Sequence, residues 1–144
     1  IEVVCRNEFF LPENADSFDF SQYDYIADCI DTVSGKLEIA VRANKADVPV
    51  ISAMGAANKL SCVGFEISDI YKSSVCPLAR VMRTELRKRG VKHLKVVYSK
   101  EQAIKPSSAE SDRNGRAVPA SISYVPATVG LIMAQQIIRD IIGI

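Results

Sequence analysis

The sequence predicts an α/β fold with a mainly parallel sheet and flanking helices, and three observations support this. Short apolar runs alternate with segments of helical periodicity, which is the order found in layered α/β domains. The 144 residues are 48% hydrophobic, which is enough for one domain with its own core. The formal net charge is only +1, which excludes disorder driven by charge repulsion. We therefore expect a single domain over residues 1–144, with a long loop at about 100–120.

Strands are expected where four to eight mostly apolar residues are bounded by turn residues. The runs that fit this description are 1–6, 25–30, 48–53, 60–67 and 94–99. The first run begins with the first residue, so the chain is expected to open in mid-strand, as the carboxy-terminal portion of a longer protein would.

Helical spacing is found in three segments, 32–46, 77–90 and 126–142. In the last segment, we expect five apolar residues to face inward: Ala134, Ile137, Ile138, Ile141 and Ile142. Four polar residues are expected to face outward: Gln135, Gln136, Arg139 and Asp140. Because Pro126 and these polar residues interrupt it, the segment falls short of the ~20 apolar residues that a membrane span needs.

The cysteines indicate a reducing compartment, and we expect a cytoplasmic protein. The four cysteines, at positions 5, 29, 62 and 76, contain no Cys-x-x-Cys pair and no dense disulfide framework. His93 is the only histidine in the sequence. A structural zinc site would need paired cysteine or histidine ligands, so we expect none.

Asp31 is the first candidate for a functional residue, because it follows a buried strand and precedes a helix. Ligands of open α/β sheets bind outside the carboxyl ends of the strands. A carboxylate at that edge can hold Mg²⁺ that bridges nucleotide phosphates, and Lys36, one turn into the helix, can balance phosphate charge. Asp31 and Thr32 are also explained as helix N-cap residues, and the two interpretations are compatible.

The glycines give no sign of a phosphate-binding loop. The seven glycines never fall in the pattern G-x-G-x-x-G or in a P-loop. If the protein uses a nucleotide, its main phosphate-binding loop must therefore come from sequence upstream or from a partner.

Basic residues are concentrated between Arg80 and Lys95, where Glu85 is the one acidic residue. Four of them are candidate contacts to RNA phosphates: Arg83, Arg87, Lys88 and Arg89. The alternative is a solvated helix face whose cationic end suits the helix dipole. The absence of interleaved aromatic residues for base stacking favours this alternative.

The segment 23–33 (YDYIADCIDTV), followed by Lys36, resembles the HesA/MoeB/ThiF family of adenylating enzymes, the bacterial relatives of ubiquitin-activating enzymes. Asp31 falls on the family's Mg·ATP-associated aspartate, and Lys36 on a position that is usually arginine or lysine. The strand 48–51 and Gly55 match the strand and glycine turn that follow. Four further segments, 77–90, 94–99, 105–106 and 121–126, resemble the tRNA threonylcarbamoyladenosine dehydratase branch of this family.

The resemblance spans the whole chain but only the later part of the family's domain. It implies a Rossmann-like fold that lacks the N-terminal glycine-rich nucleotide-binding half, with ATP and Mg²⁺ as cofactors. It also implies ATP-dependent adenylation of a carboxylate, in this branch the cyclisation of threonylcarbamoyladenosine in tRNA with loss of water. Asp31 would orient Mg²⁺, Thr32 would support the nucleotide edge and Lys36 would offset phosphate charge. A homodimer and a tRNA partner are expected, and this portion alone should be inactive.

Two alternatives remain open. The first is adenylation of the C-terminus of a ubiquitin-like or sulfur-carrier protein. Family members that pass a product to a thiol use a cysteine in the crossover loop or Cys-x-x-Cys pairs. In this sequence the corresponding loop, residues 100–124, contains no cysteine. This difference favours the dehydratase. The second alternative is a non-catalytic fragment that dimerises or binds RNA.

Overall fold

The computed structural model describes residues 1–104 and 118–144. Its centre is a four-stranded sheet with the order β1 (Ile26–Asp28), β2 (Val50–Ala53), β4 (Lys95–Ser99) and β3 (Phe65–Asp69). The strands β1, β2 and β4 are parallel, and β3 runs antiparallel to β4. The expected α/β fold with a mainly parallel sheet is therefore confirmed. Much of the expected loop at about 100–120 lies outside the described residues.

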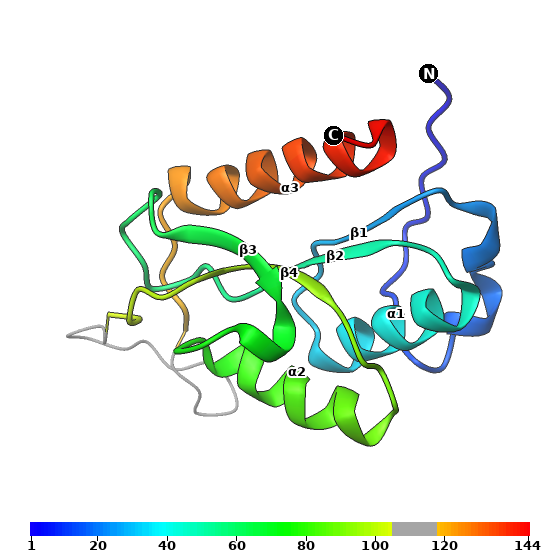
Figure 1. The fold of residues 1–144 in the computed structure, drawn as a ribbon, viewed down its shortest axis with the longest axis horizontal. Coiled ribbons are helices and arrows are strands. Elements are labelled where there is room, and N and C mark those ends of the chain that lie inside the picture. Colours follow the sequence, from blue (N-terminus) through cyan, green and yellow to red (C-terminus); the bar gives the residue numbers. More distant parts are fainter. Residues whose placement is uncertain (105–117) are drawn as a thin grey trace.

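Helices cover both faces of the sheet (Figure 1). α1 (Val33–Ala46) and α2 (Pro77–Lys88) lie on one face, and α3 (Tyr124–Ile142) lies on the other. Because successive side chains of a strand point to opposite faces, β4 contributes to two cores. Val96 and Tyr98 pack with α1 and α2, whereas Val97 packs with α3.

The first two helices begin and end close to the expected positions. Pro77 is the first residue of α2, where its missing N–H costs nothing, and the chain leaves this helix through Gly90 at φ +74°. The strand expected at 60–67 is displaced to 65–69. The carboxylate of Glu101 accepts hydrogen bonds from the N–H groups of Leu60 and Ser61, so these groups are unavailable to a strand ladder.

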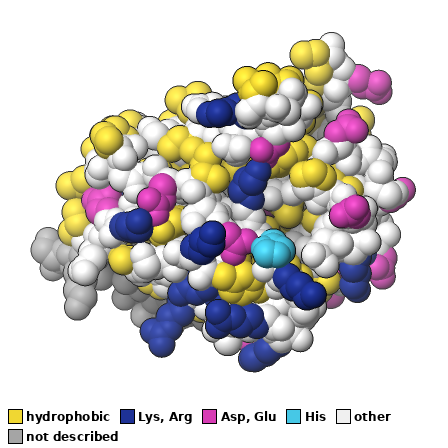
Figure 2. Space-filling view, viewed as in Figure 1, with side chains coloured by type: hydrophobic (Ala, Val, Ile, Leu, Met, Phe, Trp, Pro, Cys, Tyr) yellow, Lys and Arg dark blue, Asp and Glu magenta, His cyan; other side chains and the backbone are white. Residues whose placement is uncertain are grey.

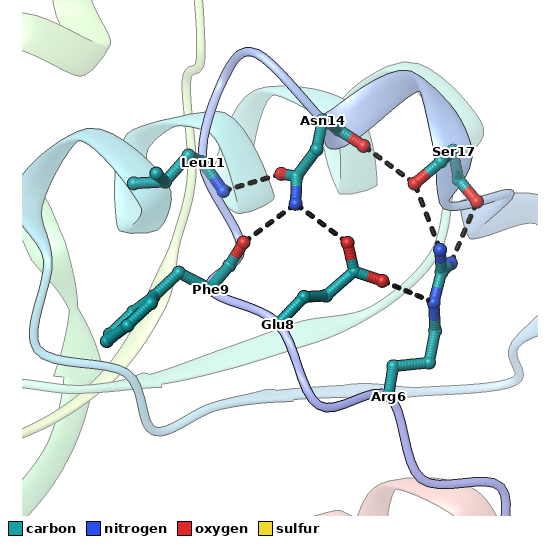
Figure 3. A network of polar contacts seen from close by, with 6 residues as sticks. All are labelled: Arg6, Glu8, Phe9, Leu11, Asn14 and Ser17. Carbon is teal, nitrogen blue, oxygen red and sulfur yellow. Dashed lines mark hydrogen bonds and ion pairs between the residues drawn. The ribbon is translucent and has the colours of Figure 1, made fainter.

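The strand expected at residues 1–6 is wrong: these residues are exposed and form no regular element. Figure 3 shows that the following residues fold around Asn14 instead. Its side chain accepts a hydrogen bond from the N–H of Leu11 (2.8 Å) and donates to Glu8 (3.0 Å) and to the carbonyl of Phe9 (2.7 Å). Arg6 bonds to Glu8 and Ser17, which closes the network. A strand needs a partner strand, and the described residues supply none for this segment.

α3 presents a different face to the sheet from the one expected. The buried residues recur every fourth position, at Val125, Val129 and Met133, and Ile137 packs beside them. Four residues that were expected to face inward do not: Ala134 is exposed, and Ile138, Ile141 and Ile142 are 58–60% exposed. Because this helix is apolar on more than one side, its periodicity could not select the buried face.

By length and composition alone, α3 is long and apolar enough to cross a membrane, and only 17% of its most apolar stretch is buried. One such helix is weak evidence for a membrane span, because core helices of soluble domains can be as long and as apolar. Its row of buried residues packs against β2 and β4.

Candidate active site

A cleft of about 540 Å³ opens at the edge where the parallel strands end. The loop after β1 and the loop after β2 form two of its sides, and the sheet-facing side of α3 forms another. The lining residues include Ile30, Asp31, Met54, Gly55, Val129 and Met133. A second hollow of about 610 Å³ shares Gly55, Ala57 and Leu78 with the cleft and extends towards the start of α2. This is the edge at which open α/β sheets bind ligands.

Asp31 lies in the cleft lining with an exposed side chain. Within residues 1–104 and 118–144, its carboxylate accepts no hydrogen bond and forms no ion pair. Thr32 occupies the N-cap position of α1 with an extended backbone, but its hydroxyl makes no capping hydrogen bond. Neither side chain therefore caps the helix, and the carboxylate beside the helix N-terminus retains its acceptor sites for a ligand.

Lys36 is placed differently from Asp31, although it also lines the cleft. Its side chain is only 1% exposed, and Nζ lies 3.1 Å from each carboxylate oxygen of Asp28. Nζ also lies 3.3 Å from Oγ of Ser52, whose hydroxyl donates a hydrogen bond to Asp28. The ammonium expected to offset phosphate charge is thus held by a buried carboxylate.

Gly35 explains how the start of α1 fits at this position. A Cβ atom there would lie 2.7 Å from the carbonyl oxygen of Phe10 and 2.7 Å from Cδ1 of Ile30. The first turn of the helix therefore packs directly on the backbone of the N-terminal segment, which only glycine permits.

The described residues contain no group of three or more His, Cys, Asp or Glu side chains that could hold a metal ion. Mg²⁺ does not require such a group, because it is commonly bound by one or two carboxylates together with substrate phosphates and water. The exposed carboxylate of Asp31 in the cleft lining fits this mode of binding.

The four basic residues proposed from the sequence lie on or just beyond α2, away from the cleft lining. Arg83 bonds to Ser73, and Arg87 lies over the ring of Tyr71. Lys88 and Arg89 both form ion pairs with Glu85 at 2.7 Å. Figure 2 shows several Lys and Arg side chains on the lower part of the face in view, where Figure 1 places α2, and others nearer the centre and the top.

The ThiF family model matches residues 1–144. The chain belongs to the ThiF family. It is 34% identical to the tRNA threonylcarbamoyladenosine dehydratase of Bacillus subtilis, an alignment that covers 98% of this chain and 59% of that protein. It is also 38% identical to tRNA threonylcarbamoyladenosine dehydratase 2 of Saccharomyces cerevisiae, over 70% of this chain and 23% of the relative. The resemblance to this branch is therefore confirmed, and the chain spans little more than half the length of the first of these relatives.

Solved structures show the same fold. The Escherichia coli tRNA N6-threonylcarbamoyladenosine dehydratase, TcdA, in complex with AMP superposes with a TM-score of 0.81 at 21% identity. The alignment covers 96% of this chain and 56% of that one. The same enzyme in complex with ATP gives a TM-score of 0.77 at 20% identity. The expected Rossmann-like fold is thus shown.

Sequence reasoning missed Asp28 and Ser52, which hold Lys36. Each is 1% exposed, and the two are partners in the register of β1 and β2. Two signals were present: a polar residue within each apolar strand, and the spacing of eight residues between Asp28 and Lys36.

Sequence reasoning also missed Asn58, which has a left-handed backbone at φ 57°. Its N–H donates to the carbonyl of Ala120 (2.7 Å), and its side-chain oxygen accepts from the N–H of Ala120 (2.9 Å). Its carbonyl accepts from the N–H of Ile104 (2.7 Å). This residue ties the loop after β2, one side of the cleft, to two segments that are distant in the sequence.

Proposed function

We propose that residues 1–144 form one domain, the carboxy-terminal part of an ATP-dependent enzyme that adenylates a carboxylate. One observation carries this proposal: the exposed carboxylate of Asp31, which has no partner within residues 1–104 and 118–144, lines a cleft at the carboxyl ends of the parallel strands. Membership of the ThiF family supports it. The glycine-rich loop that would hold the phosphates is absent from the sequence, so residues 1–144 alone should be inactive.

In this proposal, Asp31 holds Mg²⁺ beside the nucleotide, and Thr32, whose hydroxyl does not cap α1, supports the nucleotide edge. The N-terminus of α1 adds its dipole, which favours an anionic group at this position. Lys36 also lines the cleft, and its positive charge would offset phosphate charge at a distance while its ammonium stays paired with Asp28. ATP supplies the adenylyl group that turns the carboxylate into an acyl-adenylate with release of pyrophosphate.

The substrate that we favour is the carboxylate of threonylcarbamoyladenosine in tRNA, which would cyclise with loss of water. The names of the relatives support this choice. Intramolecular attack on the acyl-adenylate needs no protein thiol, which agrees with the absence of cysteine from residues 100–124. We place the enzyme in the cytoplasm as a homodimer; all four cysteines are unpaired, as a reducing compartment requires.

For contact with tRNA we propose the basic surface around α2: Arg83, Arg87, Lys88 and Arg89. Because Lys88 and Arg89 share Glu85, phosphate binding would compete with their ion pairs. Exposed ion pairs contribute little, so this competition is a small obstacle.

The test is ATP–pyrophosphate exchange by the full-length protein, supplied in turn with threonylcarbamoyladenosine-containing tRNA, unmodified tRNA and a carrier protein that ends in Gly-Gly. We expect ATP–pyrophosphate exchange with the modified tRNA and none with the other two acceptors. Exchange with the carrier protein would replace the substrate assignment. Absence of exchange with every acceptor would reject adenylation and leave a binding module.

A further inference from the structure

The buried network of Asp28, Lys36 and Ser52 lies directly beneath the candidate site. We infer that this network positions the carboxylate of Asp31, and that Lys36 acts through Asp28 rather than by contact with a phosphate. The inference rests on the proposed function, because it assigns a role to residues of the same cleft.

The network closes a short loop in the chain. Asp28 is the last residue of β1, and Lys36 lies in the first turn of α1. Their ion pair, 3.1 Å to both oxygens, joins the two ends of the segment in which Asp31 lies. The N–H of Ile30 donates to Oδ1 of Asp28 at 3.3 Å, which fixes the backbone direction immediately before Asp31.

The sheet holds the other side of the network. Ser52 of β2 stands opposite Asp28 in the strand register and donates its hydroxyl to Oδ2. Asp28 is therefore bonded by β2, by α1 and by its own turn, and it cannot rotate without breaking contacts to all three. Asp31 lies three residues along the chain from this fixed point.

The contacts of Lys36 argue against direct binding of a phosphate. To reach a ligand, its ammonium would have to leave Asp28, and a buried carboxylate would remain without a counter-ion. A buried ion pair is in general no more stabilising than apolar residues of the same volume, so stability alone is a weak reason for this pair. Side chains that support metal ligands from behind, by contrast, affect metal affinity or activity about 10–100-fold.

The decisive variant is the double substitution Asp28→Leu with Lys36→Met in the full-length protein, because either single change would leave a buried charge unpaired. The milder variant is Ser52→Ala, which keeps both charges. The matched control is Arg42→Met. Arg42 lies on α1, as Lys36 does, but outside the cleft lining, and it pairs with Glu38 of α1 and with Asp16 of the N-terminal segment. Exchange rates would be measured across a Mg²⁺ titration, and urea unfolding would confirm that each variant is folded.

We expect the double variant to lose about 10–100-fold in kcat and to need more Mg²⁺ for half-maximal rate. Ser52→Ala should change both quantities in the same direction by less, with KM for ATP unchanged at saturating Mg²⁺. A double variant whose loss lies in KM for ATP, with an unchanged Mg²⁺ requirement, would show that Lys36 contacts phosphate. Wild-type behaviour of both variants would make the network purely structural. Either result overturns the inference.

A second measurement separates this inference from the proposed function. Amide hydrogen exchange over residues 28–36 reports the positioning of the turn whether or not the protein adenylates anything. We expect exchange in this segment to be faster in the double variant and in Ser52→Ala, with unfolding midpoints close to that of the wild type. Unchanged exchange in both variants would contradict the inference even if adenylation were established.

Discussion

Asp31 and Asp140 are carboxylates at opposite ends of the sheet, and they have opposite surroundings. Asp140 of α3 accepts hydrogen bonds from the hydroxyl of Tyr25 (2.6 Å), the amide of Gln136 (2.7 Å) and the ammonium of Lys95. Asp31 accepts none from the part of the chain that the structure describes. The bond from Lys95, followed by that from Tyr25, holds the pKa of Asp140 at about 2, below its ordinary value of 3.8.

The difference separates a structural carboxylate from one that is free to bind a ligand. The acceptor sites of Asp140 are used to fasten α3 to the amino-terminal ends of β1 and β4. Those of Asp31 lie at the cleft and are used by none of the described residues. Substitution of Asp31 should therefore affect activity, whereas substitution of Asp140 should affect stability.

The largest effect is expected for Asp31→Ala in the full-length protein. ATP–pyrophosphate exchange should fall by about 10²–10³-fold, the usual consequence of removing a group that stabilises charge in the transition state. The melting temperature should stay the same, because the side chain is exposed and bonds to none of the residues that the structure describes. The control is Asp24→Asn, which removes an exposed carboxylate elsewhere and should leave exchange unaltered. Wild-type exchange rates for Asp31→Ala would show that Asp31 has no catalytic role and only precedes the first turn of α1.

Gly35→Ala should destabilise the protein by about 1–3 kcal/mol, as overpacking does. The added Cβ would meet a backbone carbonyl at 2.7 Å, and a backbone atom cannot move aside as a flexible side chain does. Urea unfolding measures the change. Gly130→Ala is the matched control, since a Cβ at that helical position meets nothing within 4 Å. Equal stability of the two variants would contradict the close contact.

Asp140→Ala is expected to lower stability and spare activity, the opposite of Asp31→Ala. Losing the bonds to Lys95, Tyr25 and Gln136 should lower the free energy of unfolding by about 1 kcal/mol, a modest amount because the site is partly solvated. Exchange activity should change less than twofold. A loss of activity without a loss of stability would mean that this end of the sheet also serves the reaction.

The smallest effect concerns pH. Because folding lowers the pKa of Asp140 from 3.8 to about 2, its contribution to stability is fully present above the unfolded value. That contribution is lost as pH falls through 3.8 towards 2. The difference in melting temperature between the wild type and Asp140→Asn should therefore be constant above about pH 5 and shrink below it. A difference that persists at pH 2 would show that the carboxylate charge is not its source.

Local patterns were sufficient for much of the fold. The helix over 77–90 was foreseeable because proline and glycine mark its two ends and its apolar spacing is regular. The position of Asp31 was foreseeable for the same reason, since a strand followed by a helix places the connecting residue at the sheet edge. The bonds of Lys36 were not foreseeable. Lys36 bonds to Asp28 and Ser52, which are brought side by side by the register of β1 and β2.

The residue order by itself determined the alternation of strands and helices, the family membership and the placement of Asp31 between a strand and a helix, because these depend on neighbouring residues alone. Only the tertiary structure decided which face of α3 is buried, where the ammonium of Lys36 points and why residues 1–6 form no strand. Each of those features depends on a packing surface, a counter-ion or a partner strand from outside the segment itself, and the local sequence does not specify these contacts.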